Sequence, residues 1–106
     1  MATSLYLLFM ASVYILHSPS ADKFYIGFTT LSVEERTARH LQEYYQNKFT
    51  SNYADWILFF QLKCETNEQA RCIEAHIKKM KSKAYIKNLI KFPEISEKLL
   101  QKFKDS

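Results

Sequence analysis

The stretch Phe24-Tyr25-Ile26-Gly27-Phe28-Thr29 contains the only glycine among the 106 residues of the chain. Its aromatic and branched residues are typical of a β-strand. A glycine at such a place predicts a bulge, a positive φ angle or the close approach of a ligand to the backbone. A second strand-forming run, Ser12-Val13-Tyr14-Ile15-Leu16, precedes it, and residues 17–23 between the two are turn-forming. The two runs predict an antiparallel hairpin that sets Tyr14 and Tyr25 on neighbouring strands.

A helix and a third strand are expected after the hairpin. The pattern Ser32-Val33-Glu34-Glu35 is a capping box, which predicts a helix from about Val33. Arg36 and His40 are four residues apart and therefore lie on one flank of that helix. The run from Trp56 to Leu62 is apolar almost throughout, so we expect it to be the central strand of the sheet.

The remainder of the chain has the periodicity of helices. A second capping pattern at Thr66-Asn67-Glu68-Gln69 opens a helix whose expected buried stripe is Ala70, Ile73, Ile77 and Met80, with Glu74 adjacent to that stripe. A short helix from about Ala84 to Lys91 ends before Pro93. The apolar residues of a last amphipathic helix are Ile95, Leu99, Leu100 and Phe103.

Length and composition indicate one globular domain with a small extension at each end. Apolar residues make up 47% of the chain and aromatic residues 15%, which favours a packed core over a disordered chain. We divide the sequence into an N-terminal extension at 1–9, a domain at 10–92 and a C-terminal helix at 93–106. The apolar run that ends at Leu16 is too short and too interrupted to span a bilayer, and two cysteines are too few for a zinc ribbon. A cytoplasmic protein with reduced thiols and no membrane association is therefore expected.

Positive charge is concentrated in one part of the chain. The formal net charge is +4, with an isoelectric point near 9.1. No acidic residue lies between Glu74 and Glu94, whereas that interval contains six lysines: Lys78, Lys79, Lys81, Lys83, Lys87 and Lys91. Such a stretch is often only a solvated helix face, but it is also typical of a surface that contacts phosphates.

The ordered motifs resemble those of one nuclease family. Val13-Tyr14-Ile15, Tyr25-Ile26-Gly27, the pair Arg36 and His40, and Glu74 ahead of Ile77-Lys78-Lys79 are similar to the GIY-YIG nuclease superfamily. The resemblance extends over most of the chain. The members that the chain resembles are the small single-domain ones and the N-terminal nuclease domain of the bacterial excision-repair incision protein. The resemblance implies an α/β fold in which a small three-stranded antiparallel sheet is flanked by helices, in the order strand, strand, helix, strand, helix, helix.

The resemblance also implies a metal-dependent DNA endonuclease with a role in DNA repair or processing. Its catalytic residues would be Tyr14, Tyr25, Arg36, His40 and Glu74. Glu74 would hold Mg²⁺ or Mn²⁺, because magnesium takes few protein ligands and a carboxylate oxygen suits it. Arg36 would contact the scissile phosphate through its planar guanidinium. The expected nucleic-acid contacts are Gly27, Lys48, Lys78, Lys81, Lys83 and Asn88, and a partner subunit or a homodimer would supply targeting.

Plainer interpretations of the same residues stay open at this point. Glu74 with Lys78 is also an ordinary helix ion pair, and tyrosines on strands are usually packing residues. The sequence leaves open which tyrosine is the general base and whether RNA is a substrate. One alternative function is a nucleic-acid-binding module that cuts poorly, and another is an interaction domain for an acidic protein partner.

Overall fold

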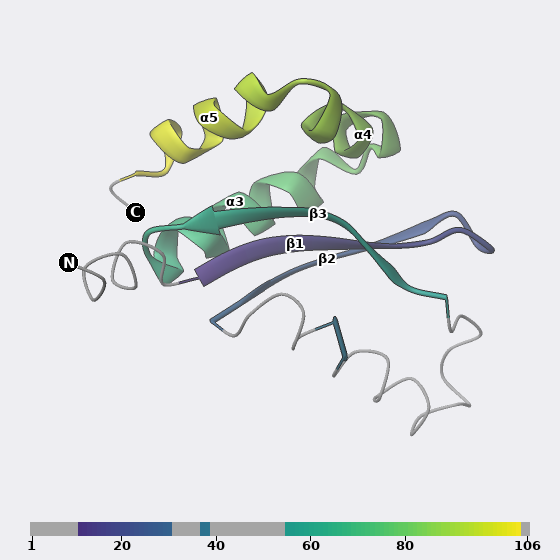
Figure 1. Ribbon diagram of the computed structural model, residues 1–106. Helices are drawn as coiled ribbons and strands as arrows, with labels where there is room; N and C mark the ends of the chain where they lie inside the picture. Colours follow the sequence, from purple (N-terminus) through teal and green to yellow (C-terminus); the bar gives the residue numbers. More distant parts are fainter. Residues whose placement is uncertain (1–10, 31–36, 39–54, 105–106) are drawn as a thin grey trace.

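The fold is a three-stranded antiparallel sheet with helices packed on one face (Figure 1). The structure is a computed structural model, and it describes residues 11–30, 37–38 and 55–104. The strands are β1 (Ala11–Ser18), β2 (Lys23–Thr29) and β3 (Ile57–Cys64), and the helices are α3 (Asn67–Met80), α4 (Lys83–Lys91) and α5 (Pro93–Lys102). The predicted α/β class and antiparallel sheet are confirmed. The extension at 1–9 and nearly all of the helix expected from Val33 lie outside the described residues.

The central strand is β1, because the sheet order is β2-β1-β3. The expectation that the run from Trp56 to Leu62 is central is therefore wrong, and that run forms an edge strand. β1 has a neighbour on both sides, and its alternating side chains serve both faces of the sheet. Val13 and Ile15 belong to the core beneath the helices, whereas Tyr14 and Leu16 form a second small cluster with Trp56.

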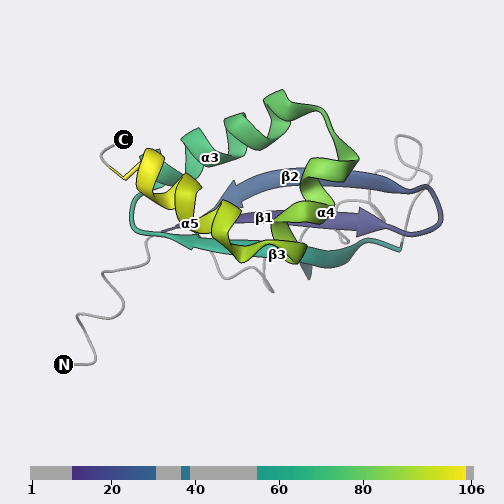
Figure 2. The same ribbon diagram turned by 90° about the horizontal axis from the view of Figure 1, so that it is seen from above.

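A bulge explains why β3 is so apolar at an edge. Ile15 pairs with Phe60 but the next residue, Leu16, pairs with Leu58, so Phe59 has no direct partner on β1. Phe59 and Phe60 both pack against the core cluster. A bulge brings consecutive side chains toward one face in this way, which a regular strand does not do. The helices that cover this face are seen from above in Figure 2.

The helices contribute the rest of the core, and α3 and α4 begin at side-chain caps. The Thr66 hydroxyl accepts a hydrogen bond from the Gln69 backbone N–H at 3.0 Å, and the Ser82 hydroxyl accepts one from Tyr85 at 3.1 Å. The buried helix residues in the main cluster are Ala70, Ile73, Ile77, Ile86, Leu89 and Leu99.

The buried stripe of α3 differs from the predicted one at both ends. Met80 is 44% exposed, since Lys81 takes a left-handed conformation with φ of 48° and ends the helix there. Gln69 is buried instead, at 2% exposure. Its side-chain amide donates to the Leu100 carbonyl at 2.9 Å and accepts from the Glu65 N–H at 2.8 Å. Gln69 therefore ties α5 to the start of α3, which an apolar side chain of similar size cannot do.

The hairpin turn is fastened to the start of β3 by Asp55. Its carboxylate accepts hydrogen bonds from the Ser18 hydroxyl at 2.6 Å and from the Ser20 backbone N–H at 2.8 Å. These donors hold the pKa of Asp55 below its ordinary value of 3.8, the Ser18 hydroxyl having the largest effect.

We expect Asp55→Asn to lower the melting temperature at neutral pH. A carboxyl group whose pKa is lowered by folding stabilises the protein above its unfolded pKa and ceases to do so as the pH falls through the folded value. The difference in melting temperature between wild type and Asp55→Asn should therefore shrink in solutions more acidic than pH 3.8. Melting curves followed by circular dichroism across this range are the measurement, with Glu97→Gln as an exposed control. A difference that is unchanged by acid would contradict the role of the carboxylate.

The two cysteines are free and differ in burial. Cys64, at the end of β3, is fully buried, and burial raises the pKa of its thiol to about 11. Cys72 on α3 is half-buried.

We expect native protein at pH 8 to react with iodoacetamide at Cys72 well before Cys64. A rise in the thiol pKa from 9.0 to about 11 lowers the reactive thiolate fraction roughly a hundredfold, and burial adds to the protection. Peptide mapping by mass spectrometry separates the two sites, and denatured protein, in which both should react, is the control. Equal labelling in the native state would show that Cys64 is accessible.

Candidate active site

The phenol ring of Tyr14 lies directly against Gly27 on the neighbouring strand. The two residues are Cα partners in the β1–β2 ladder. A Cβ atom placed on Gly27 would lie 2.6 Å from the Tyr14 Oη and 2.8 Å from its Cζ, closer than real contacts allow. The φ angle of Gly27 is not positive, and the bulge is on the other side of β1. Of the expected reasons for a glycine here, a close approach is the one found, and the group that approaches is the tyrosine side chain.

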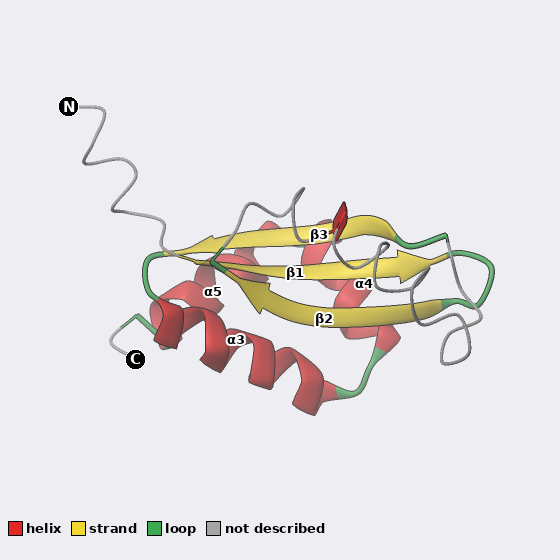
Figure 3. Ribbon diagram, turned by 90° about the horizontal axis from the view of Figure 1, so that it is seen from below, coloured by secondary structure: helices red, strands yellow, loops and turns green. Residues whose placement is uncertain are grey.

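Tyr25 lies beside Tyr14 on the face of the sheet opposite the main core. It pairs with Leu16, so its side chain projects to the same side as those of Tyr14 and Leu16. The two phenol rings are stacked, with centroids 6.2 Å apart and planes inclined by 29°. Their accessibility differs, because Tyr25 is 38% exposed and Tyr14 only 1%. The sheet is seen from this side in Figure 3.

Glu74 lies on the flank of α3 that faces β2. Its side chain is 19% exposed and forms an ion pair with Lys78 at 3.5 Å. Arg71, one turn earlier on the same flank, has its guanidinium 5.8 Å from the ring of Phe28 in β2. The Arg71 contact brings this flank of α3 to the core face of β2, whereas Tyr25 and Gly27 lie on the other face of that strand. Sequence reasoning missed Arg71, although its spacing of three residues from Glu74 was a usable signal.

The residues expected to contact nucleic acid differ from one another in their exposure and in their partners. The Lys78 ammonium pairs with Glu74, and the Lys83 ammonium contacts Asp22 of the hairpin turn at 3.0 Å. Lys81 is exposed at the end of α3. Asn88 is half-buried within α4, where its backbone carbonyl accepts from the Phe92 N–H at 2.8 Å. Lys83 therefore has a structural partner in addition to any ligand.

Three of the predicted site residues are not among those described. Arg36, His40 and Lys48 lie outside the described residues, and the catalytic candidates that the structure describes are Tyr14, Tyr25 and Glu74.

The donor atoms in this site suit magnesium better than a metal that needs several protein ligands. Among residues 11–30, 37–38 and 55–104 there is no group of three or more histidine, cysteine, aspartate or glutamate side chains that could hold a metal ion. Glu74 is a hard oxygen donor that is partly exposed, as a ligand to a largely hydrated Mg²⁺ must be. A soft thiolate site is excluded within the described residues, because Cys64 is buried away from other ligands.

Comparison with known proteins identifies the family. The model of the GIY-YIG catalytic domain matches residues 10–88, which is most of the chain and includes Tyr14, Tyr25, Arg36, His40 and Glu74. No curated protein and no solved structure gave a significant match. None of the helices in the described ranges has the length and apolar character needed to cross a membrane. The motifs, the sheet and the family match agree, and the chain therefore belongs to the GIY-YIG catalytic domain family of nucleases.

Proposed function

We propose that the chain is a metal-dependent endonuclease that hydrolyses phosphodiester bonds in DNA. The observation that carries this proposal is the pairing of Tyr14 with Gly27, which holds one phenol firmly beside the accessible phenol of Tyr25. Glu74 would supply a carboxylate from α3, which packs against the sheet. Two phenols and a carboxylate match the needs of phosphodiester hydrolysis, which are a water-positioning group, a proton acceptor and a metal ligand.

The two tyrosines are suited to different tasks. Tyr25 is exposed, so its hydroxyl can reach a water molecule or a phosphate, and we assign it the role of general base. Tyr14 is buried, and its ring is fixed between β1 and β2, so we assign it the role of positioning Tyr25 and the attacking water. Arg36 would donate to the phosphate oxygens, where negative charge grows in the transition state, and His40 would assist proton transfer.

Glu74 would hold the divalent cation, Mg²⁺ or Mn²⁺. Bound there, the cation would polarise the scissile phosphate and make the attacking water more acidic. One protein carboxylate is sufficient for magnesium, which keeps several water molecules and takes a further ligand from the substrate phosphate.

The proposal also covers the residues that contact DNA, the targeting of the enzyme and its cellular role. Gly27, Lys48, Lys78, Lys81, Lys83 and Asn88 would line the path of the DNA backbone. Targeting would depend on DNA shape, on a partner subunit or on a homodimer. The proposed role in DNA repair or processing is supported only by the resemblance of the sequence motifs. Free thiols at both cysteines support a cytoplasmic location.

One observation favours a second candidate, a nucleic-acid-binding module that cuts poorly. The Glu74 carboxylate is engaged by Lys78, as in an ordinary helix ion pair. If this ion pair is the only role of Glu74, the sheet face would bind nucleic acid without cleaving it.

The experiment that separates the two is cleavage of labelled duplex, flap, branched and single-stranded DNA with Mg²⁺ or Mn²⁺. Wild type should cut at least one substrate, and Tyr25→Phe should cut it about a hundredfold more slowly, because it lacks the proton acceptor. Tyr85→Phe on α4 is not a suitable control, since the half-buried Tyr85 ring packs on His76. Lys23→Gln, exposed on the same strand as Tyr25, serves instead. Binding without cutting by every protein would favour the binding module.

A further inference from the structure

The flank of α3 opposite Glu74 carries a group of aromatic and basic side chains. His76 follows Glu74 by two residues, which is about 200° around a helix, so the two face away from each other. The His76 ring lies among aromatic residues of the next two helices. Its centroid is 6.0 Å from that of Tyr85 in α4 and 6.0 Å from that of Phe103 at the end of α5. This contact joins α3, α4 and α5 on the helical side of the molecule.

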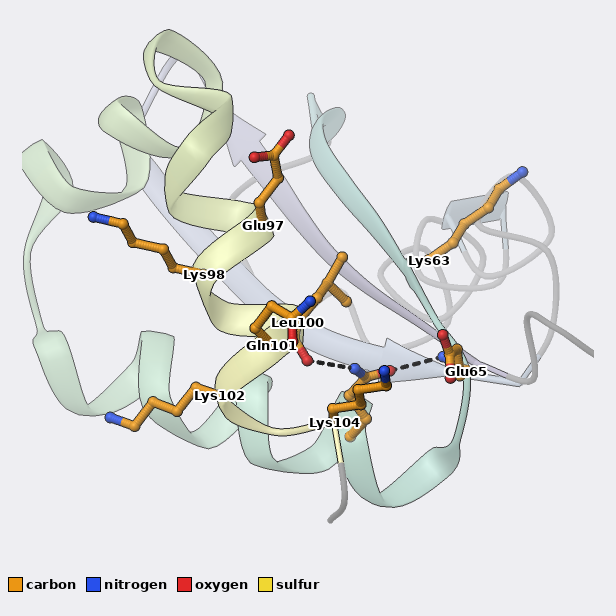
Figure 4. Close-up of a pocket in the computed structure, with 9 residues that line it drawn as sticks. Lys63, Glu65, Glu97, Lys98, Leu100, Gln101, Lys102 and Lys104 are labelled. Atoms are coloured by element: carbon orange, nitrogen blue, oxygen red, sulfur yellow. Dashed lines mark hydrogen bonds between the residues drawn. The ribbon is translucent and has the colours of Figure 1, made fainter.

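Positive charges converge around His76. The charged groups that act most strongly on its ring are the ammonium groups of Lys102 and Lys79. The Lys102 ammonium lies 5.4 Å from the centre of the Phe103 ring. Lys98 is one turn earlier in α5, and Figure 4 shows the Lys98 and Lys102 side chains directed to the same side.

These lysines differ from those expected to contact nucleic acid. Lys78 and Lys83 each contact a carboxylate. Within the described part of the chain, neither Lys79, Lys98 nor Lys102 forms an ion pair. Like charges held close together without a counter-charge repel each other, so an approaching polyanion is favoured at this place.

A hollow of about 840 Å³ adjoins the same flank of α5. It lies between the end of β3, the start of α3 and α5, and its lining includes Lys63, Lys98, Lys102 and Lys104 against Glu65 and Glu97 (Figure 4). The ammonium groups of Lys63 and Lys98 point in different directions in that view. The lysines are therefore spread along the surface, which suits an extended backbone of phosphates better than one small anion.

We propose that Lys79, Lys98 and Lys102 form a second phosphate-contact surface for nucleic acid, separate from the residues of the chemical step. The proposal rests on the proposed function, because it takes DNA to be the polyanion. Tyr14 and Tyr25 project from the opposite face of the sheet, so this surface holds a part of the DNA at a distance from the bond that is cut. The domain thereby gains affinity and a preference for DNA that bends or branches around it.

Binding of labelled DNA in EDTA tests the proposal without cleavage. The variant is Lys98→Gln with Lys102→Gln, and the matched control is Lys23→Gln with Lys91→Gln. The control removes the same charge, and it removes a similar contact, since the Lys91 ammonium lies 5.5 Å from the centre of the Phe92 ring. We expect the variant to bind about tenfold more weakly than wild type, with a salt dependence reduced by about two phosphate contacts. The control should bind within about twofold of wild type.

The imidazole of His76 gives a second signal, readable by NMR. Phosphates bound over this surface would lie close to the His76 ring, so DNA should shift the ring resonances at constant pH in wild type and in the control. The groups nearest the ring are Lys79, Lys102, Tyr85 and Phe103.

The outcomes separate this proposal from the proposed function. If wild type binds and cuts DNA, but both double variants bind equally well and His76 does not respond, only the second surface is wrong. If polyglutamate of equal charge displaces DNA as effectively as unlabelled DNA does, the surface is an acidic-protein site instead. If wild type neither binds nor cuts any DNA, the proposed function itself fails.

Discussion

Gly27→Ala should lower the free energy of unfolding by about 2 kcal/mol and slow DNA cleavage about a hundredfold. The new Cβ would lie 2.6 Å from the Tyr14 Oη, and that ring is 1% exposed, so it has little room to move. Alanine restricts the unfolded chain more than glycine does, which offsets part of the cost. Displacing the ring also moves the phenol that positions Tyr25. Urea unfolding and cleavage rates measure the two effects.

The Tyr14→Phe background is the control for this mechanism. It removes the nearest atom but leaves Cζ at 2.8 Å, so we expect Gly27→Ala to cost about 1 kcal/mol less there than in wild type. Lys23→Ala, exposed on the same strand, should change stability by no more than about 0.5 kcal/mol. A Gly27→Ala protein as stable and as active as wild type would show that the contact with Tyr14 is not restrictive.

Glu74→Gln should reduce DNA cleavage about a thousandfold while leaving DNA binding within about twofold of wild type. The amide keeps the size of the side chain but lacks the charge that holds a divalent cation. Folding should be little affected, because the partly exposed pair with Lys78 contributes no more than about 0.5 kcal/mol. Single-turnover cleavage, binding in EDTA and thermal melting test the three statements.

Glu68→Gln is the matched control for the loss of a carboxylate from α3. Glu68 is exposed in the first turn of the same helix, away from the strand pair of the site. The Glu68→Gln variant should cut DNA at the wild-type rate. Cleavage that persists in Glu74→Gln would refute the metal role of Glu74 and would require another ligand for the cation.

The sequence was sufficient to predict the hairpin and the start of α3. These depend on local signals, namely strand-forming runs on either side of turn residues and a hydroxyl three residues before the N–H that it caps. The contact of Tyr14 with Gly27 was not predicted. The lone glycine indicated a bulge, a positive φ angle or the approach of a ligand, whereas the group that approaches is a side chain across the ladder, where register decides which residue meets it.

The order of the strands in the sheet and the two ends of the buried stripe of α3 were not predictable from local sequence signals. The apolar run of β3 suggested a central strand, yet its bulge sends both Phe59 and Phe60 to the core and makes an edge strand look buried. Met80 fits the helical period, but the left-handed residue after it ends the helix before that side chain is covered. Gln69 is buried because α5 offers it a carbonyl, a contact between segments 31 residues apart.

The two faces of β1 also bear on how relatives of this chain can diverge. Val13 and Ile15 are fully buried under the helices, and Tyr14 is confined against Gly27 on the other face, so adjacent positions on one strand serve the main core and the proposed chemistry separately. A substitution on β1 is therefore rarely neutral for both stability and the proposed activity. New substrate preferences should arise instead on α4 and α5, where exposed positions such as Lys87 and Lys98 can change without disturbing the sheet.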